Sequence, residues 1–443
     1  MNRPGRRTTT ARSLALELLL EFERDPFPLT SALEQQEERL SDPRERHLLH
    51  TLVLETLRHR TRLDFVVSKF LRKGTVDDLP ARTRNILRIG AVQILLLDRI
   101  PPHAAVSTAV DLAHAKHGAG LPPLVNAILR KLVREGRSRW DELDRTVRPN
   151  LALRYSHPQW LVERWTGRWG RERTEAMLRW NSVAPDYWLR LAPGAAPPPD
   201  ATPGWIPGTA RWPAGSRPEL SEEFRAGALT VQDGSAILVG CLPPCVHGLV
   251  LDCCAAPGTK LSHLNERAES GTTLIGLDLS WGRLARLRAG LGRHRNVEGV
   301  RIGIVNADAT RLPLRPPWQG VVIDAPCSNL GVLRRRVDAR WRVQSEDPAE
   351  LAELQSRLLE AAAHGLEPGG WLVYSVCTIE PEETILQRRS FLERHSDWTP
   401  IPSPEFVPQE ARLEPGEILL LPGEHETDGT YAFAVRKPQT SGS

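Results

Sequence analysis

Residues 248–267, GLVLDCCAAPGTKLSHLNER, indicate the fold class of the C-terminal half of the chain. This stretch begins with a short apolar run ending at Asp252, passes through small residues around Pro257, and then becomes helical from Lys260 to Arg267. A strand that leads through a small-residue turn into a helix is the opening unit of a parallel sheet covered by helices. In such sheets ligands bind beyond the carboxyl ends of the strands, which is where this turn lies.

The residues that follow repeat the alternation of strands and helices. Predicted strands cover 272–279, 300–305, 321–324, 371–376, 418–421 and 431–435, and predicted helices cover 281–291 and 349–366. This pattern predicts an α/β fold with a Rossmann-like, mostly parallel sheet and helices on both faces.

Acidic residues end three of the predicted strands, namely Asp278, Asp308 and Asp324. Asp278 lies 278 − 252 = 26 residues after Asp252, close to the ~20 expected of a ribose-binding acid. The turn matches neither GxGxxG nor GxxxxGK[ST], which disfavours dinucleotides and phosphate loops. One such Asp is more often a loop cap, but three at successive strand ends favour an adenosine-containing cofactor without pyrophosphate, for which S-adenosyl-L-methionine is the obvious candidate.

Two cysteines also end strands, in DAPC (324–327) and YSVC (374–377). Either one alone is more often a buried small hydrophobe. As a pair they suit methylation of carbon 5 of cytosine, because a thiolate that adds at carbon 6 makes carbon 5 nucleophilic. An acid near ring nitrogen 3 would stabilise the developing charge, and a base would remove the hydrogen at carbon 5 so that the thiolate can leave.

The spacing of apolar residues in the N-terminal third of the chain predicts an all-helical bundle. Apolar residues repeat at helical spacing from Ala11 to Phe22, and further helices are predicted to start at Pro43, at Pro80, after Pro102 and at Pro122, the last ending at Glu135. A polar linker follows. The segment 150–225 is rich in Trp, a residue that is more often buried than free to stack on bases. Within it, residues 193–218 are predicted to form a loop.

Length and composition set the outer limits. The 443 residues favour about three domains, which we predict at 1–140, 150–225 and 226–438. The net charge of +4 excludes a histone-like protein but allows a local basic groove. No apolar run reaches ~18 residues, so a cytoplasmic location is expected. Cys241 and Cys245 with His247 lack a second ligand pair, so no metal site is expected.

Several motifs together resemble the Nop/Sun family of RNA cytosine-5 methyltransferases: LDCCAAPGTK (251–260), DAPCSNLG (324–331), YSVCT (374–378), VQDGSA (231–236) and TDGTYAFAVRK (427–437). IPPHAAVSTAVDLAHAKHG and LPPLVNAILRKL (100–132) resemble the last helices of a NusB-like RNA-binding domain. With GVLRRRVDARW (331–341), the whole chain is similar to the branch of the family that acts on 16S rRNA. Asn329 stands where the family usually has a small residue.

The resemblance implies roles for individual residues. Cys377 would be the nucleophile, Cys327 would assist product release, and Asp324 would face the cytosine. The residues implied in cofactor binding are Cys254, Ala255, Ala256, Pro257, Gly258, Thr259, Lys260, Asp278, Asp308 and Asp324.

The expected partner is 16S rRNA, free or in early assembly, and the chain is expected to act as a monomer. The target base must be unstacked to reach a thiol. The arginines at 334, 335, 336, 340 and 342 suit RNA phosphates, with a solvated charged loop as the alternative. Two other functions stay open: the same chemistry on 23S rRNA or tRNA, and a non-catalytic RNA-binding assembly factor with a vestigial cofactor site.

Overall fold

The computed structural model describes residues 9–114, 121–147, 149–293, 297–312 and 317–439. The chain divides into two compact units, one formed by Met1–Ser182 with Arg336–Gln344 and the other by Val183–Arg335 with Ser345–Ser443. The division falls inside the predicted middle segment 150–225. That this segment acts as an RNA-binding subdomain of its own remains a prediction. Residues 115–120, which include the end of the first NusB-like motif, lie outside the described residues.

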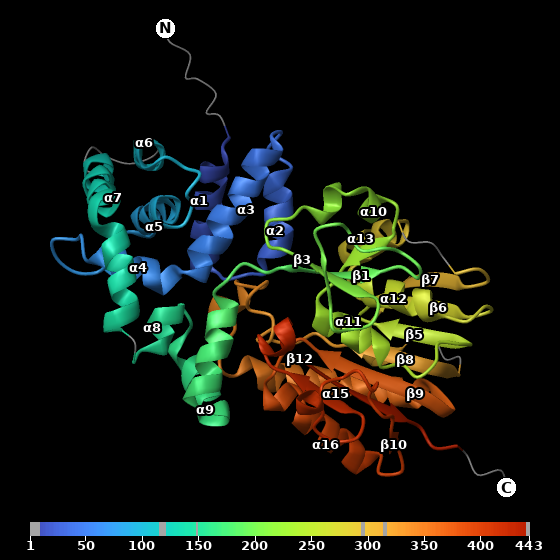
Figure 1. Ribbon diagram of the computed structural model, residues 1–443. Coiled ribbons are helices and arrows are strands. Elements are labelled where there is room, and N and C mark those ends of the chain that lie inside the picture. Colours follow the sequence, from blue (N-terminus) through green and yellow to red (C-terminus); the bar gives the residue numbers. More distant parts are fainter. Residues whose placement is uncertain (1–8, 115–120, 148, 294–296, 313–316, 440–443) are drawn as a thin grey trace. The chain divides into compact units, whose positions relative to one another are not determined.

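The first unit is helical, as predicted (Figure 1). Its helices are α1 (Ala11–Arg24), α2 (Leu29–Glu37), α3 (Pro43–Arg58), α4 (Arg60–Ser68), α5 (Ala81–Leu95), α6 (Pro102–His114), α7 (Leu121–Thr146), α8 (Leu151–Tyr155), α9 (Gln159–Asn181) and α14 (Ala339–Arg342). The predicted start of α3 is confirmed, since the Asp42 side chain accepts a hydrogen bond from the Arg44 backbone and Pro43 occupies the first turn.

Helix α7 corrects the prediction of a linker after Glu135, because it continues to Thr146. The added turns look polar in sequence, yet Trp140 and Leu143 are buried in the same core as Leu129 and Leu132. These four residues keep the helical spacing, so the charged residues between them occupy the outer face of one amphipathic helix.

The second unit is built on an eight-stranded sheet in its described residues, with the order β10-β12-β9-β8-β5-β6-β7 and β11 paired to β12. The strands are β5 (Leu249–Cys253), β6 (Thr273–Asp278), β7 (Arg301–Asn306), β8 (Trp318–Asp324), β9 (Leu366–Val376), β10 (Thr399–Pro400), β11 (Glu417–Leu420) and β12 (Thr430–Arg436). Strands β5 to β9 are parallel, whereas β12 runs antiparallel to β9. The predicted Rossmann-like sheet is therefore confirmed.

Helices cover both faces of this sheet (Figure 1). One face packs against α11 (Gly234–Cys241), α12 (Thr259–Arg267) and α13 (Trp281–Leu291), and the other against α15 (Asp347–Gly365) and α16 (Ile385–Arg394). Successive strand residues alternate between the two cores, as Val250 and Leu251 do. This alternation follows from the two-residue period of a strand.

A smaller antiparallel sheet precedes the large one in the chain. It contains β1 (Tyr187–Leu191), β2 (Thr202–Pro203), β3 (Thr209–Trp212) and β4 (Leu229–Val231) in the order β2-β3-β1-β4, and helix α10 (Glu222–Arg225) precedes β4. The loop prediction for 193–218 was therefore wrong at β2 and β3. Ala210 packs against Leu189 and Leu229 in a small core of its own, a contact distant in sequence that local Pro and Gly content conceals.

No helix in the described part of the chain is both long and apolar enough to cross a membrane.

Candidate active site

The predicted site residues lie at one edge of the large sheet. Asp278 and Asp324 are the last residues of β6 and β8, while Cys254 and Cys377 directly follow β5 and β9. Because these strands are parallel, their carboxyl ends meet at a single edge. The structure thus brings together residues that are up to 123 positions apart in the chain (377 − 254).

The two thiols predicted to react are in contact. The sulfur of Cys327 lies 3.2 Å from that of Cys377, and the Cys377 thiol donates to Oδ1 of Asn329 at 3.1 Å. Because Cys377 donates its proton to Asn329, Cys327 must be the donor in the hydrogen bond between the two sulfurs. The hydrogen bond to Cys377 and burial raise the pKa of Cys327 well above its usual value. Cys327 therefore holds its proton.

The backbone keeps the two cysteine loops close together. Gly331 donates from its N–H to the Cys377 carbonyl at 3.1 Å and accepts from Gly429 at 2.8 Å. A Cβ on Gly331 would lie 2.5 Å from the Gly429 carbonyl oxygen, so only glycine fits. Asn329 adopts a left-handed conformation, with φ +62°, and its amide donates to the Cys327 carbonyl at 2.8 Å. Asn329 is thus a site residue that the sequence marked only as a departure from the family pattern.

A lysine–aspartate pair lies beside the thiols. The Nζ of Lys260 is 2.6 Å from Oδ2 of Asp324, and the Ser375 hydroxyl donates to the other carboxylate oxygen at 3.0 Å. Burial opposes the charge on Lys260, but Asp324 outweighs it and raises the pKa of Lys260. Lys260 is also near enough to Cys377 for their charges to interact. The structure therefore places a largely buried cation beside the two thiols.

The turn after β5 is shaped by unusual backbone conformations. Cys254 has φ +61°, Gly258 has φ +106°, and the Ala256–Pro257 bond is cis. Gly258 is the N-cap of α12 and supplies no side-chain acceptor, so the first N–H groups of the helix face the turn without a cap. Such an open helix start binds carboxylates and other anions. Burial raises the pKa of the Cys254 thiol to about 12, which keeps it protonated and unreactive.

Asp278 and Asp308 differ in their surroundings. Asp278 is buried and accepts from the backbone N–H groups of Ala256 at 3.3 Å and Ser280 at 2.9 Å, which ties it to the turn. Asp308 is exposed, and one of its oxygens caps a short 3₁₀ turn through the backbone and hydroxyl of Thr310. These hydrogen bonds lower the pKa of Asp308. Both acids therefore hold local backbone in place, and Asp278 also pairs with Arg283 at 3.5 Å.

Asp252 is a further residue of interest at this edge of the sheet. In the sequence it served only as the end of the first predicted strand, from which the spacing to Asp278 was counted. It is fully buried in β5, and neither carboxylate oxygen has a hydrogen-bond partner. Burial, and then Asp324, raises its pKa well above the usual value. An unpartnered buried carboxyl is costly and points to an absent ligand. The signal in the sequence was its position at the end of the strand that leads into the turn.

The arginine-rich segment does not form the phosphate-binding surface predicted for it. Arg335 bonds to Asp428 at 2.7 Å and Asp233 at 2.9 Å, and Arg340 is fully buried in the helical unit. Arg334 is buried as well and donates to the Ala184 carbonyl, while Arg342 pairs with Asp338. Only Arg336 of this group is exposed. Most of these guanidinium groups therefore bind other parts of the protein and are not available to RNA phosphates. The density of charge in the sequence could not reveal this.

Comparison with known proteins identifies the family. The 16S rRNA methyltransferase RsmB/F model matches residues 239–436, and the NusB family model matches residues 9–134. The chain is 30% identical to a probable ribosomal RNA small subunit methyltransferase B of Bacillus subtilis, over 97% of this chain and 99% of that protein. The chain belongs to the 16S rRNA methyltransferase RsmB/F family. A second relative, a probable ribosomal RNA small subunit methyltransferase B of Synechocystis, is 32% identical over 97% of this chain and 99% of its own.

The fold is shared with a solved structure. The crystal structure of PH0851 superposes with a TM-score of 0.75 at 21% identity, covering 97% of this chain and 99% of that one. As a member of the RsmB/F family, the chain is a methyltransferase that acts on small-subunit rRNA, and its cofactor is S-adenosyl-L-methionine.

The residues at the sheet edge fit this cofactor. The open start of α12 suits its carboxylate, Asp278 suits the ribose hydroxyls, and the orphaned Asp252 faces no other partner. When bound, the cofactor supplies an electrophilic methyl group. Among the described residues no cluster of three or more His, Cys, Asp or Glu could hold a metal ion.

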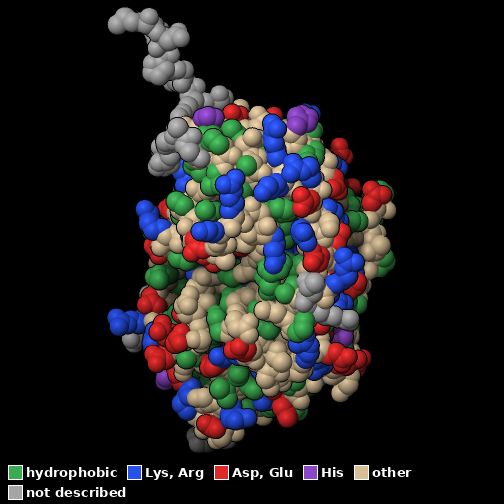
Figure 2. Space-filling view, turned by 90° about the vertical axis from the view of Figure 1, so that its left-hand side faces the viewer, with side chains coloured by type: hydrophobic (Ala, Val, Ile, Leu, Met, Phe, Trp, Pro, Cys, Tyr) green, Lys and Arg blue, Asp and Glu red, His purple; other side chains and the backbone are tan. Residues whose placement is uncertain are grey.

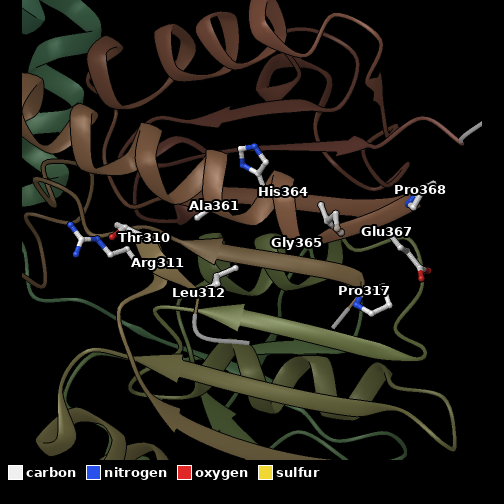
Figure 3. Close-up of a pocket in the computed structure, with 10 residues that line it drawn as sticks. Thr310, Arg311, Leu312, Pro317, Ala361, His364, Gly365, Glu367 and Pro368 are labelled. Atoms are coloured by element: carbon white, nitrogen blue, oxygen red, sulfur yellow. The ribbon is translucent and has the colours of Figure 1, made fainter. Parts of the chain in front are cut away.

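A separate cavity of about 730 Å³ lies between the segment that follows β7 and the junction of α15 with β9 (Figure 3). Thr310, Arg311 and Leu312 line it after β7, Pro317 lines it just before β8, and His364, Gly365 and Glu367 line it where α15 passes into β9. None of the predicted site residues lines this cavity. We therefore assign it no part in methyl transfer.

The distribution of charged side chains on the surface does not by itself indicate where RNA binds. On the face drawn in Figure 2, Lys and Arg side chains are interspersed with Asp and Glu, in keeping with the small net charge. Arg130 on α7 is exposed but bonds to Asn126 at 3.0 Å. Charge alone therefore does not mark the RNA-binding surface on that face.

Proposed function

We propose that the chain methylates carbon 5 of one cytosine in 16S rRNA through a covalent bond between Cys377 and carbon 6 of the base. The observation that carries this proposal is the 3.2 Å contact between the sulfurs of Cys327 and Cys377 at the cofactor edge of the sheet. Two strand-end thiols in contact match a reaction in which one sulfur attacks and the other helps to reverse the attack.

Cys377 is the nucleophile in this proposal. Cys327 directs its proton toward the Cys377 sulfur, and the Lys260 ammonium lies close enough to act on it, so both favour a thiolate at that position. The thiolate forms a bond to carbon 6, and the electron pair of the 5,6 double bond moves to carbon 5 and into the ring. Carbon 5 would then take the methyl group that the bound cofactor supplies, with the electron pair of the broken methyl–sulfur bond left on the cofactor sulfur.

The Lys260–Asp324 pair faces the polar edge of the cytosine in this proposal. Asp324 can accept a hydrogen bond from the base, and Lys260 can donate one, so the pair stabilises charge that spreads over the ring. The pair is held by its own 2.6 Å contact and by Ser375. Preorganised groups of this kind need no rearrangement during the reaction.

Cys327 acts in the second half of the reaction. Once the Cys377 sulfur is bonded to carbon, it no longer carries the charge that holds the proton on Cys327. The pKa of Cys327 then falls and its proton passes to solvent. The resulting Cys327 thiolate takes the proton from carbon 5. The bond between Cys377 and carbon 6 breaks with the electron pair leaving on sulfur, which restores the 5,6 double bond.

The remaining parts of the assignment stay predictions. They are the roles of the turn 254–260 and of Asp278 and Asp308 in cofactor binding, the choice of free or partly assembled 16S rRNA, and the monomeric state. That the chain works in the cytoplasm also remains a prediction.

The proposal is tested by methyl transfer from labelled S-adenosyl-L-methionine to protein-free 16S rRNA, with mass-spectrometric identification of the product nucleoside. We expect a single 5-methylcytosine with the wild type and none with Cys377→Ala, while cofactor binding to the variant stays near normal. Methyl transfer that persists in Cys377→Ala, or a label on another atom of the base, would overturn the assignment.

A further inference from the structure

Glu383 is a buried carboxylate that the reaction described above does not use. It lies in a short 3₁₀ turn after β9 and is fully buried. Among the described residues no Lys, Arg or His forms a salt bridge with it. A carboxylate without a cation in such a position is costly to fold. Its surroundings therefore call for a functional explanation.

The carboxylate holds the loop that carries Cys327. One oxygen accepts from the backbone N–H of Ser328 at 2.9 Å, and the other accepts from the Ser328 hydroxyl. Gln355 of α15 donates to the first oxygen at 3.0 Å and to the Pro326 carbonyl at 2.9 Å. The residues on both sides of Cys327 are thus fixed by Glu383 or by its partner Gln355.

The same cluster reaches the loop that carries Cys377. The Ser328 hydroxyl lies 2.8 Å from the hydroxyl of Thr378, the residue after Cys377. The Tyr374 hydroxyl donates to the Glu383 carbonyl at 2.9 Å from within β9. Each reactive cysteine is therefore followed by a hydroxyl residue, and these two hydroxyls meet at one carboxylate.

We propose that Glu383, acting through Ser328 and Thr378, is a positioning residue that sets the spacing of the Cys327 and Cys377 sulfurs. The inference rests on the proposed function, because it concerns the step in which both sulfurs act on one base. Glu383 touches neither sulfur and does not react. Burial raises its pKa to about 7, outweighing the hydrogen bonds from Ser328, Gln355 and Thr378.

The shared hydrogen bond is tested by a double-mutant cycle. Ser328→Ala and Thr378→Val each remove one hydroxyl of the link between the loops. We expect each to lower kcat about 10-fold, since small displacements of reacting groups carry penalties of that order, with the RNA KM and the cofactor Kd within about twofold of wild type. The double variant should lose about 10-fold rather than about 100-fold, because both changes remove the same link.

The carboxylate itself is tested by conservative and disruptive variants. Glu383→Gln keeps an oxygen to accept from Ser328 and Gln355 and an amide to donate to the hydroxyl, so it should retain at least about half of the wild-type kcat. Glu383→Ala should lose about 10-fold or more. Glu417→Gln is the control for a buried carboxylate on β11. Glu417 accepts from Tyr431 at 2.6 Å and pairs with Arg388 at 3.3 Å, and neither partner belongs to the loops that carry Cys327 and Cys377. The Glu417→Gln variant should leave kcat of the folded protein unchanged.

Three results would overturn the inference: a fully additive double variant, unchanged kcat in both single hydroxyl variants, or a Glu383→Gln variant as impaired as Glu383→Ala. An equal loss in Glu417→Gln would assign the effect to stability and overturn it too. Failure of the proposed function is distinguishable, because the wild type would then form no 5-methylcytosine. If the wild type forms it while the cycle is additive, only the inference about Glu383 fails.

Discussion

Replacing Arg340 by Met should strongly destabilise the helical unit. The Arg340 guanidinium is fully buried and donates to three backbone carbonyls, those of Arg58 at 2.9 Å, Ser156 at 3.0 Å and Asn181 at 2.9 Å. These carbonyls lie at the C-terminal ends of α3, α8 and α9. A cation there satisfies carbonyls that have no partner within their helices and matches the negative end of each helix dipole.

The size of the effect follows from this geometry. Three hydrogen bonds from a charged donor contribute roughly 1.5–3 kcal/mol each, and the cost of burying the charge offsets part of that sum. Burial lowers the pKa of Arg340 to about 9, so the group still carries its charge at neutral pH. We expect a net loss of about 3–5 kcal/mol, which for a unit of this size lowers Tm by about 6–20 °C.

Differential scanning calorimetry of the full chain measures this loss. The control is Arg342→Met, since Arg342 lies in the same short helix but is partly exposed and pairs only loosely, at 3.7 Å, with Asp338. Because Asp338 is buried, the control should also lower Tm, but by less than Arg340→Met does, since it removes one contact of 3.7 Å rather than three hydrogen bonds. If Arg340→Met shifts Tm no more than Arg342→Met does, the capping argument is wrong.

Three further outcomes are expected. Cys327→Ala should accumulate a covalent protein–RNA species that migrates slowly on a denaturing gel, because nothing removes the hydrogen at carbon 5; rapid turnover without such a species would contradict the release role. Asp278→Ala should weaken cofactor binding by roughly 1–3 kcal/mol, the value of hydrogen bonds to a charged group, whereas Asp308→Ala should weaken it less; calorimetry with equal affinities for both would reject that ranking. Because the pKa of Glu383 is raised to about 7 in the folded state, the folded protein binds a proton there that the unfolded chain releases above about 4.3. The stabilisation from this proton is therefore complete below the unfolded pKa and is lost as pH rises through 7, by about 3–4 kcal/mol in total. Glu383→Gln should flatten this part of the dependence of Tm on pH, and an unchanged slope would contradict the raised pKa.

The sheet and its reactive edge could be predicted from local sequence because each strand carries its own signal. Short apolar runs ending in small or acidic residues fix where β5, β6 and β8 end, and parallel pairing then brings Asp278 and Asp324 to one edge. The helix 281–291 was predicted with the bounds that the structure shows. These features need no knowledge of distant contacts.

What the sequence could not supply were partnerships between distant residues. In the sequence Arg340 is one of several neighbouring arginines. Its structural role depends on backbone carbonyls that lie 159 to 282 positions earlier in the chain. Glu383 likewise becomes informative only when Ser328, 55 positions earlier, is seen to contact it. Buried polar networks of this kind are set by tertiary packing, which local propensity does not encode.

The most direct test of the covalent mechanism uses a 16S rRNA substrate in which cytosines are replaced by 5-fluorocytosine. Fluorine at carbon 5 cannot be removed by a base as a proton can, so the bond between sulfur and carbon 6 cannot be broken after methyl transfer. We predict a stable protein–RNA complex that depends on S-adenosyl-L-methionine, with the nucleotide attached to the peptide that contains Cys377. Attachment at Cys327, or methyl transfer with no covalent complex, would contradict it.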